Sequence, residues 1–206
     1  MAKFSSTKFG KISGKHGTAV SATLNGESIL KVFSPSTNPN TPAQQEQRLK
    51  FGLVTTTLQP LRQIASIGFG SRRGIYDAIS IALRNAIKGD FPNFTIDFSK
   101  VVLSSGTLPK SAAVSVAKGA GNQATVTWDT AVWNLATPQD WVYIAFLEEN
   151  DKMSFILSEK LLRSAGNCAV EFPALFASST VHGWIFFVSP GGDQRSVSQY
   201  LGSIAL

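Results

Sequence analysis

Charged residues are scarce in this chain. Asp, Glu, Lys and Arg together make up 16% of its 206 residues, against about 25% in an average soluble domain. Hydrophobic residues make up 43%, which is enough for a core and excludes a globally disordered chain. A surface with few charges exposes neutral polar or apolar groups instead. We therefore expect a folded protein whose surface suits association with other subunits.

Cysteine and long apolar runs are also lacking. Cys168 is the only cysteine, so no intrachain disulfide can form and the fold does not depend on an oxidising compartment. The longest apolar runs, Trp141–Leu147 and Trp184–Val188, are far shorter than the roughly 20 residues of a membrane-spanning helix. Met1–Gly17 has no apolar stretch typical of a signal peptide. We expect a protein without a membrane partner that is synthesised in the cytoplasm, whether or not it later enters a particle.

The residue types that perform catalysis are few and scattered. His16 and His182 have no partners at metal-ligand spacing, so no metal site is predicted. Cys168 lies in a candidate strand, where it would behave as a small hydrophobic residue. Gly10–His16 approaches a phosphate-binding loop but is one residue short and precedes a hairpin instead of a helix. The sequence therefore predicts a protein that is not an enzyme, with no catalytic residue, cofactor or small-molecule substrate.

The N-terminal part, 1–92, reads as a basic α/β segment. A hairpin is predicted over 18–33, because Asn25-Gly26 suits a tight two-residue turn. One helix is predicted over 42–58, with Pro42 at its first position and Pro60 beyond its end. A second helix is predicted over 74–88, where isoleucine and leucine recur at i, i+4 spacing and Gly89 follows as a cap.

The C-terminal part, 93–206, lacks long helical periodicity. Short apolar segments alternate there with turn residues, at the spacing of an antiparallel sandwich of the immunoglobulin or fibronectin type. The predicted fold class is α+β, mostly β, with the hairpin and two helices packed on this sandwich. The candidate strands are 94–103, 113–117, 123–129, 141–148, 153–158, 168–172, 181–189 and 195–201.

Two of these strands, 141–147 and 184–188, are apolar on both faces. A sandwich strand with one wet face should alternate between apolar and polar residues, so a second layer must cover them. We favour the chain's own helices, which need a surface to pack on. The alternative is another subunit, and the candidate interface would then include Trp141, Tyr143, Trp184 and Phe186.

Positive charge is concentrated in the first half. Residues 1–100 hold 13 Lys/Arg and 5 Asp/Glu (+8), whereas residues 101–206 hold 6 and 8 (−2). This asymmetry fits either contact with nucleic-acid phosphates or head-to-tail association between halves of opposite sign. The candidate phosphate-binding or partner-binding residues are Lys3, Lys8, Lys11, Lys15, Arg72 and Arg73.

Six segments of the sequence form a recognisable set of motifs: GKISGKHG (10–17), TPAQQEQRLKFGLV (41–54), IGF (67–69), NAIKGDFPNFTIDFSKVVLSSGTLP (85–109), VHGWIFFVS (181–189) and SVSQYLGSI (196–204). Together they resemble a family of bacterial proteins of about this length, a domain-of-unknown-function family found mainly in Bacteroidota. The resemblance implies a full-length member without an additional domain. It implies no activity, because the family has no established catalytic or binding residues to transfer.

Three functional hypotheses follow. The first is a structural or assembly protein, such as a component of a virion or another large particle, which binds itself or other protein subunits. The second is a nucleic-acid-binding protein that uses the basic N-terminal half. The third is a glycan- or protein-binding sandwich, in which Trp128, Trp133 or Trp141 near loop ends would contact the ligand.

Overall fold

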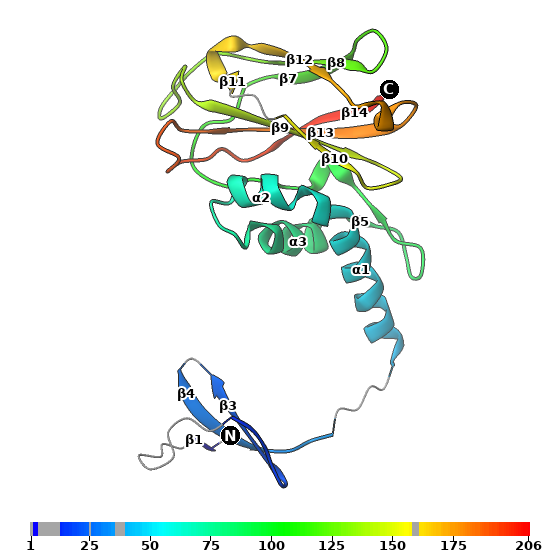
Figure 1. Ribbon diagram of the computed structural model, residues 1–206, viewed down its shortest axis with the longest axis vertical. Helices are drawn as coiled ribbons and strands as arrows, with labels where there is room; N and C mark the ends of the chain where they lie inside the picture. The colour runs from blue at the N-terminus through cyan, green and yellow to red at the C-terminus, as the bar shows by residue number, and fades with distance from the viewer. Residues whose placement is uncertain (1, 4–12, 25, 36–39, 158–160) are drawn as a thin grey trace. The chain divides into compact units, whose positions relative to one another are not determined.

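The computed structural model describes residues 2–3, 13–24, 26–35, 40–157 and 161–206 (Figure 1). Contacts divide the chain into two compact units, Met1–Thr41 and Pro42–Leu206, which we call unit 1 and unit 2. This division differs from the boundary at residue 92 that the sequence suggested. It differs because the helices after Thr41 pack on the β-sheets and share a core with them.

Unit 1 is a small antiparallel sheet. Its strand order is β1-β4-β3-β2, and the pairing of Leu24 with Glu27 leaves a two-residue turn between β3 and β4. The hairpin predicted over 18–33 is therefore confirmed, and Gly26 has the positive φ, 86°, that such a turn requires. Asn25 lies outside the described residues. The strands are β1 (Ala2–Lys3), β2 (Gly14–His16), β3 (Ala19–Leu24) and β4 (Glu27–Val32).

Unit 2 begins with three helices, α1 (Pro42–Leu58), α2 (Arg62–Gly68) and α3 (Gly74–Asn85). The bounds of α1 confirm the prediction from Pro42 and Pro60. The helix 74–88 was predicted too long: α3 ends at Asn85, because Ile87 and Lys88 leave it to form a short strand against 95–96. Gly89, with a φ of 89°, lies in the turn of that ribbon and is not a helix cap. No helix was predicted at α2, because its 7 residues are too few to show the apolar periodicity of a helix.

The sheets of unit 2 form an antiparallel sandwich. One sheet has the strand order β10-β9-β13-β14, with β11 also pairing with β9, and the other has the order β12-β8-β7. The predicted strand 94–103 is mostly a 3-10 turn and loop, and only its first residues are extended. The strands are β5 (Ile87–Lys88), β6 (Thr95–Ile96), β7 (Val114–Lys118), β8 (Gln123–Trp128), β9 (Trp141–Glu148), β10 (Ser154–Ile156), β11 (Leu161–Leu162), β12 (Asn167–Glu171), β13 (Thr180–Val188) and β14 (Gln199–Ala205).

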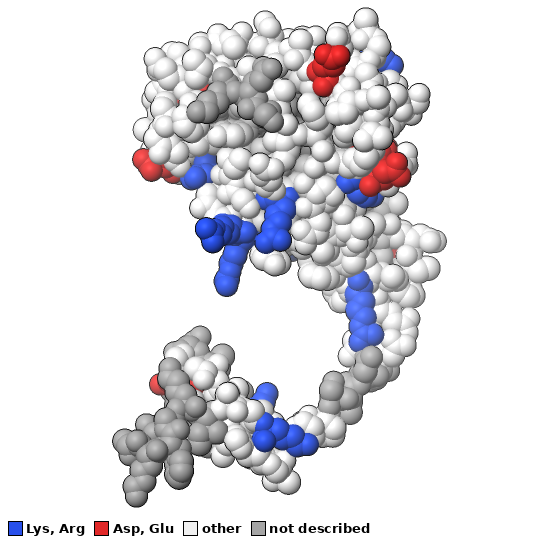
Figure 2. All heavy atoms as spheres, in the orientation of Figure 1, with Lys and Arg blue, Asp and Glu red and all other residues white. Residues whose placement is uncertain are grey.

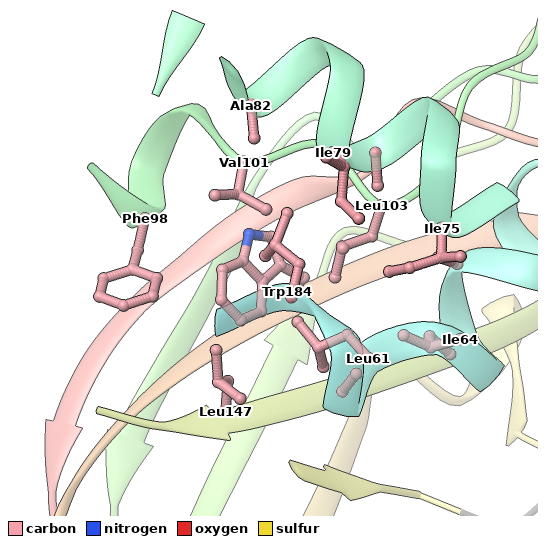
Figure 3. Packing of buried hydrophobic residues seen from close by; sticks show 14 of the residues in the cluster. Leu61, Ile64, Ile75, Ile79, Ala82, Phe98, Val101, Leu103, Leu147 and Trp184 are labelled. Carbon is pink, nitrogen blue, oxygen red and sulfur yellow. The ribbon is translucent and has the colours of Figure 1, made fainter. Parts of the chain in front are cut away.

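The central strands β9 and β13 serve two cores. Successive side chains of a strand point to opposite faces. Leu147, Trp184 and Phe186 lie in one core with the buried faces of the helices, whereas Ile144 and Phe187 lie in the other core with β8 and β12. Figure 3 shows Trp184 among residues of the helical layer. β9 and β13 are thus apolar on both faces because their sheet is the middle one of three layers, between the helices and the second sheet. The predicted fold class, α+β and mostly β, is confirmed.

Candidate functional site

The predicted basic residues fall in both units. Lys3 belongs to β1, and exposed Lys15 of β2 has its Nζ 3.9 Å from the centroid of the Phe33 ring. Arg72 and Arg73 are exposed in the turn between α2 and α3. Lys8 and Lys11 lie outside the described residues. On the face of unit 2 seen in Figure 2, Lys and Arg side chains gather over the helical layer, while most of the sandwich surface is uncharged.

The predicted interface on the central strands is not on the surface. Trp184 and Phe186 are each 1% exposed, because α1, α2 and α3 cover that face of the sheet. Tyr143 is half-buried and stacks on Phe186, with ring centroids 5.4 Å apart. Trp141 is also half-buried. The helices thus supply the cover that the alternative interpretation assigned to another subunit.

A buried ion pair fixes one end of the sandwich. The Nε of Arg163 lies 3.1 Å from Oδ2 of Asp140, and both side chains are fully buried. The Arg163 guanidinium also lies 3.9 Å from the centroid of the Phe187 ring and donates to the carbonyl of Pro109. Trp128 Nε1 donates to the carbonyl of Arg163. The pair therefore connects β9, the turn after β11 and both sheets.

The loop between β8 and β9 carries exposed apolar side chains. Val132, Trp133 and Leu135 are 44%, 41% and 52% exposed. Trp128 is buried, so of the three tryptophans considered for ligand contact only Trp133 projects from the surface. We call residues 131–135 the apolar tip.

The base of this loop is held firmly on both sides. On one side, the backbone N–H of Asp129 donates to Ser111 Oγ and to the carbonyl of Ala113, each at 2.9 Å. On the other side, Thr137 donates from its N–H and its hydroxyl to the two carboxylate oxygens of Asp140, at 3.0 and 2.8 Å. Because Asp140 is itself locked by Arg163, the tip is an exposed apolar group on an ordered support.

The outer face of α1 borders a hollow of about 340 Å³. Only the C-terminal part of α1 is buried, so Leu49 is 46% exposed. A glycine, Gly52, lies in the middle of this helix, and a Cβ placed there would meet no atom within 4 Å. The hollow is lined by Arg48, Leu49, Gly52, Leu53, Pro92 and Phe94.

Unit 1 exposes most of its side chains. Among its residues with described exposure, Ser21 alone is buried. The apolar residues Leu30, Val32 and Phe33 are 38%, 80% and 40% exposed. Leu30 and Val32 lie on the same face of β4, opposite Ser21 and Ala19 of β3. We call Leu30 and Val32 the hairpin patch, since Phe33 follows on the opposite face beside Lys15.

His182 sits in an aromatic cluster on β13. Its Nδ1 lies 2.7 Å from the hydroxyl of Tyr200, its Nε2 lies 3.7 Å from Glu149 Oε2, and its ring stacks on Phe98 at 3.9 Å. Burial lowers the pKa of His182 below its ordinary value of 6.5, although the nearby Glu149 opposes the shift. Its surroundings therefore favour the neutral imidazole.

The described ranges contain neither a cluster of metal ligands nor a membrane-spanning helix. No group of three or more His, Cys, Asp or Glu side chains is placed to hold a metal ion there. None of the helices in that part of the chain combines the length and apolarity needed to cross a membrane.

The sequence assigns the chain to a family. Residues 10–202 match a family of unknown function, DUF6266, so this three-layer protein belongs to that family. The match confirms the family resemblance drawn from the motifs. No curated protein matches the sequence. Among solved structures, the fn3 domain of the human collagen alpha-1(XX) chain is similar, with a TM-score of 0.34 and 16% identity over 50% of this chain and 86% of that chain.

Proposed function

We propose that this protein is a non-enzymatic structural component that associates with other protein subunits, including copies of itself, to build a larger particle. The observation that carries the proposal is the hairpin patch. Its residues leave apolar area in water on a sheet whose described side chains, Ser21 excepted, are all at least partly exposed. A sheet of this size needs a covered apolar face to be stable. A protein surface that covers the hairpin patch would provide it.

Charge supports an interaction between copies. Unit 1 is basic, with five lysines and one glutamate, whereas residues 101–206 carry the net charge of −2 noted above. Complementary surfaces of opposite sign accelerate and orient association. A contact between different surfaces of two copies is head-to-tail, and such contacts close into rings or continue as filaments.

The test of the proposal is the mass of the full chain in solution, measured by light scattering over a wide range of concentration. We expect a rise in mass with concentration that the double substitution Leu30→Ser with Val32→Ser weakens. Leu175→Ser, which removes a 76% exposed leucine in unit 2, is the matched control. A strict monomer at every concentration would contradict the proposal.

A second candidate function is nucleic-acid binding through the helical layer. The observation in its favour is the exposed pair Arg72 and Arg73, which lies beside Tyr76, a tyrosine 58% exposed. Arginines that contact phosphates and an aromatic ring that stacks on bases are a recurrent combination. Replacing both arginines by Gln should reduce the slope of log affinity against log salt by about one for each lost contact. No retention of DNA or RNA at low salt would exclude this candidate.

A further inference from the structure

We propose that the hollow on α1 receives the apolar tip of a second copy of this chain. This inference rests on the proposed function and names one of the contacts through which copies associate. It joins two features of unit 2, a projecting Trp133 and a hollow that contains Gly52.

Gly52 is the first reason to regard the hollow as a binding site. Glycine in the middle of a helix costs roughly 0.5–1 kcal/mol relative to alanine. Close packing against a neighbouring element can explain such a residue, but here, apart from the chain neighbours and the backbone of α1 itself, no atom lies within 4 Å of the position of a Cβ. The missing side chain instead deepens an apolar surface, and a large side chain from outside can enter it.

The size and lining of the hollow suit an aromatic anchor. Its volume of about 340 Å³ is at the small end of binding pockets, which span roughly 300–1,000 Å³. Leu49, Leu53 and Phe94 give it apolar walls. Tryptophan is among the residues enriched at the energetically dominant positions of protein interfaces, which lie in such well-packed pockets.

The apolar tip has the properties of the matching element. Trp133 and Leu135 are exposed and one residue apart in the sequence, and the hydrogen bonds at Asp129 and Thr137 hold the loop that presents them. Little conformational freedom is therefore lost when the tip binds, which favours affinity. The hollow and the tip also carry charges of opposite sign, since Arg48 lines the hollow and Asp129 begins the loop that bears the tip.

A second copy is the occupant that these observations favour. No residue of the tip lines the hollow of its own copy, and the two features belong to different layers of unit 2, because α1 is in the helical layer and the tip joins β8 to β9. The charges also argue against insertion of the tip into an anionic membrane. Lipid-binding apolar loops carry Lys or Arg beside them, whereas residues 129–140 contain two aspartates and no basic residue.

Two substitutions test the proposal from opposite sides. Trp133→Ser removes the anchor and leaves the hollow intact. Gly52→Leu fills the hollow and leaves the tip intact, and it replaces glycine by a better helix former. We expect each to weaken association of the full chain by roughly thirtyfold or more, with an unchanged melting temperature for Trp133→Ser and an equal or higher one for Gly52→Leu. Leu175→Ser serves as the control and should associate as the unsubstituted chain does.

Mixing the two variants gives the decisive measurement. Trp133→Ser still offers a hollow and Gly52→Leu still offers a tip, so an equimolar mixture should form a one-to-one dimer, whereas each variant alone should not associate through this contact. Sedimentation of the mixture and of each variant distinguishes these states. If the unsubstituted chain associates and both variants do so equally well, this inference is wrong and the proposed function stands. If the unsubstituted chain is monomeric throughout, both are wrong.

Discussion

Unit 1 and unit 2 satisfy the requirements of a folded domain to different extents. Unit 2 buries apolar side chains in two cores, one on each face of its central sheet. In unit 1 the hairpin is formed and paired, yet Ser21 is the only buried residue among those whose exposure is described. Backbone pairing alone does not stabilise so small a sheet. Paired backbone thus defines the structure of unit 1, whereas buried apolar side chains define that of unit 2.

The largest predicted difference concerns the two units in isolation. A chain of Pro42–Leu206 should retain a cooperative thermal transition, because both cores lie within it. A peptide of Met1–Thr41 should show none by circular dichroism, because little apolar area is buried there. Cooperative melting of the peptide would show that unit 1, like unit 2, folds without the rest of the chain.

The buried ion pair gives the largest predicted effect of one substitution. Asp140→Asn removes one charge of a fully buried pair and leaves the Arg163 guanidinium uncompensated. Loss of one partner from such a pair costs about 3–5 kcal/mol, which denaturant unfolding should reveal. Asp151→Asn, at an exposed aspartate, should change stability by less than about 0.5 kcal/mol. Equal effects at the two positions would contradict the role of the pair.

The same substitution, leucine to alanine, can compare how much a buried residue of unit 2 and an exposed residue of unit 1 contribute to stability. Leu103 is fully buried in the core beneath the helices, whereas Leu30 of the hairpin patch is 38% exposed. Leu103→Ala should lower the free energy of unfolding by about 2–5 kcal/mol. Leu30→Ala should leave it nearly unchanged and should affect association instead. A large loss of stability from Leu30→Ala would show that unit 1 possesses a core.

The smallest predicted effect is a pH dependence from His182. Because burial lowers its pKa in the folded state, the unfolded chain binds a proton first as the pH falls. The stabilising contribution of the neutral imidazole is therefore complete above about pH 6.5 and is lost as the pH falls below that value toward the folded-state pKa. Unfolding measured on both sides of pH 6.5 should show a steeper decline for the unsubstituted chain than for His182→Gln. A parallel decline would show that groups other than His182 dominate the pH dependence.

Sequence patterns predicted the features that depend on neighbouring residues or on the alternation of apolar and polar residues along a strand. Asn25-Gly26 indicated the hairpin, Pro42 and Pro60 bracketed α1, and the double apolar face of β9 and β13 required a cover. Which layer supplied the cover depended on contacts distant in sequence. The alternative placement of Trp184 and Phe186 in an outer interface was wrong for that reason, since helices from a separate part of the chain bury them.

The candidate binding surfaces were harder to predict. Leu49 belongs to the same helix as the buried Val54 and Leu58, but the core reaches only the C-terminal part of that helix. No local pattern reveals where a neighbouring layer ends. Val132, Trp133 and Leu135 resemble core residues in composition, so their exposure is visible only once the loop is built. Gly52 was the available signal, because a glycine inside a helical pattern usually has a packing or binding reason.

The double-faced central sheet also has a spectroscopic consequence. Trp184 lies in the core beneath the helices, and Trp128 lies in the core between the sheets. Each core thus contains its own buried indole. A chain that keeps one of these two as its only tryptophan, with Trp133 and Trp141 also replaced, would emit from a single known side of the central sheet. Their fluorescence during unfolding would reveal whether the helical layer detaches before the sandwich opens or both melt in one step.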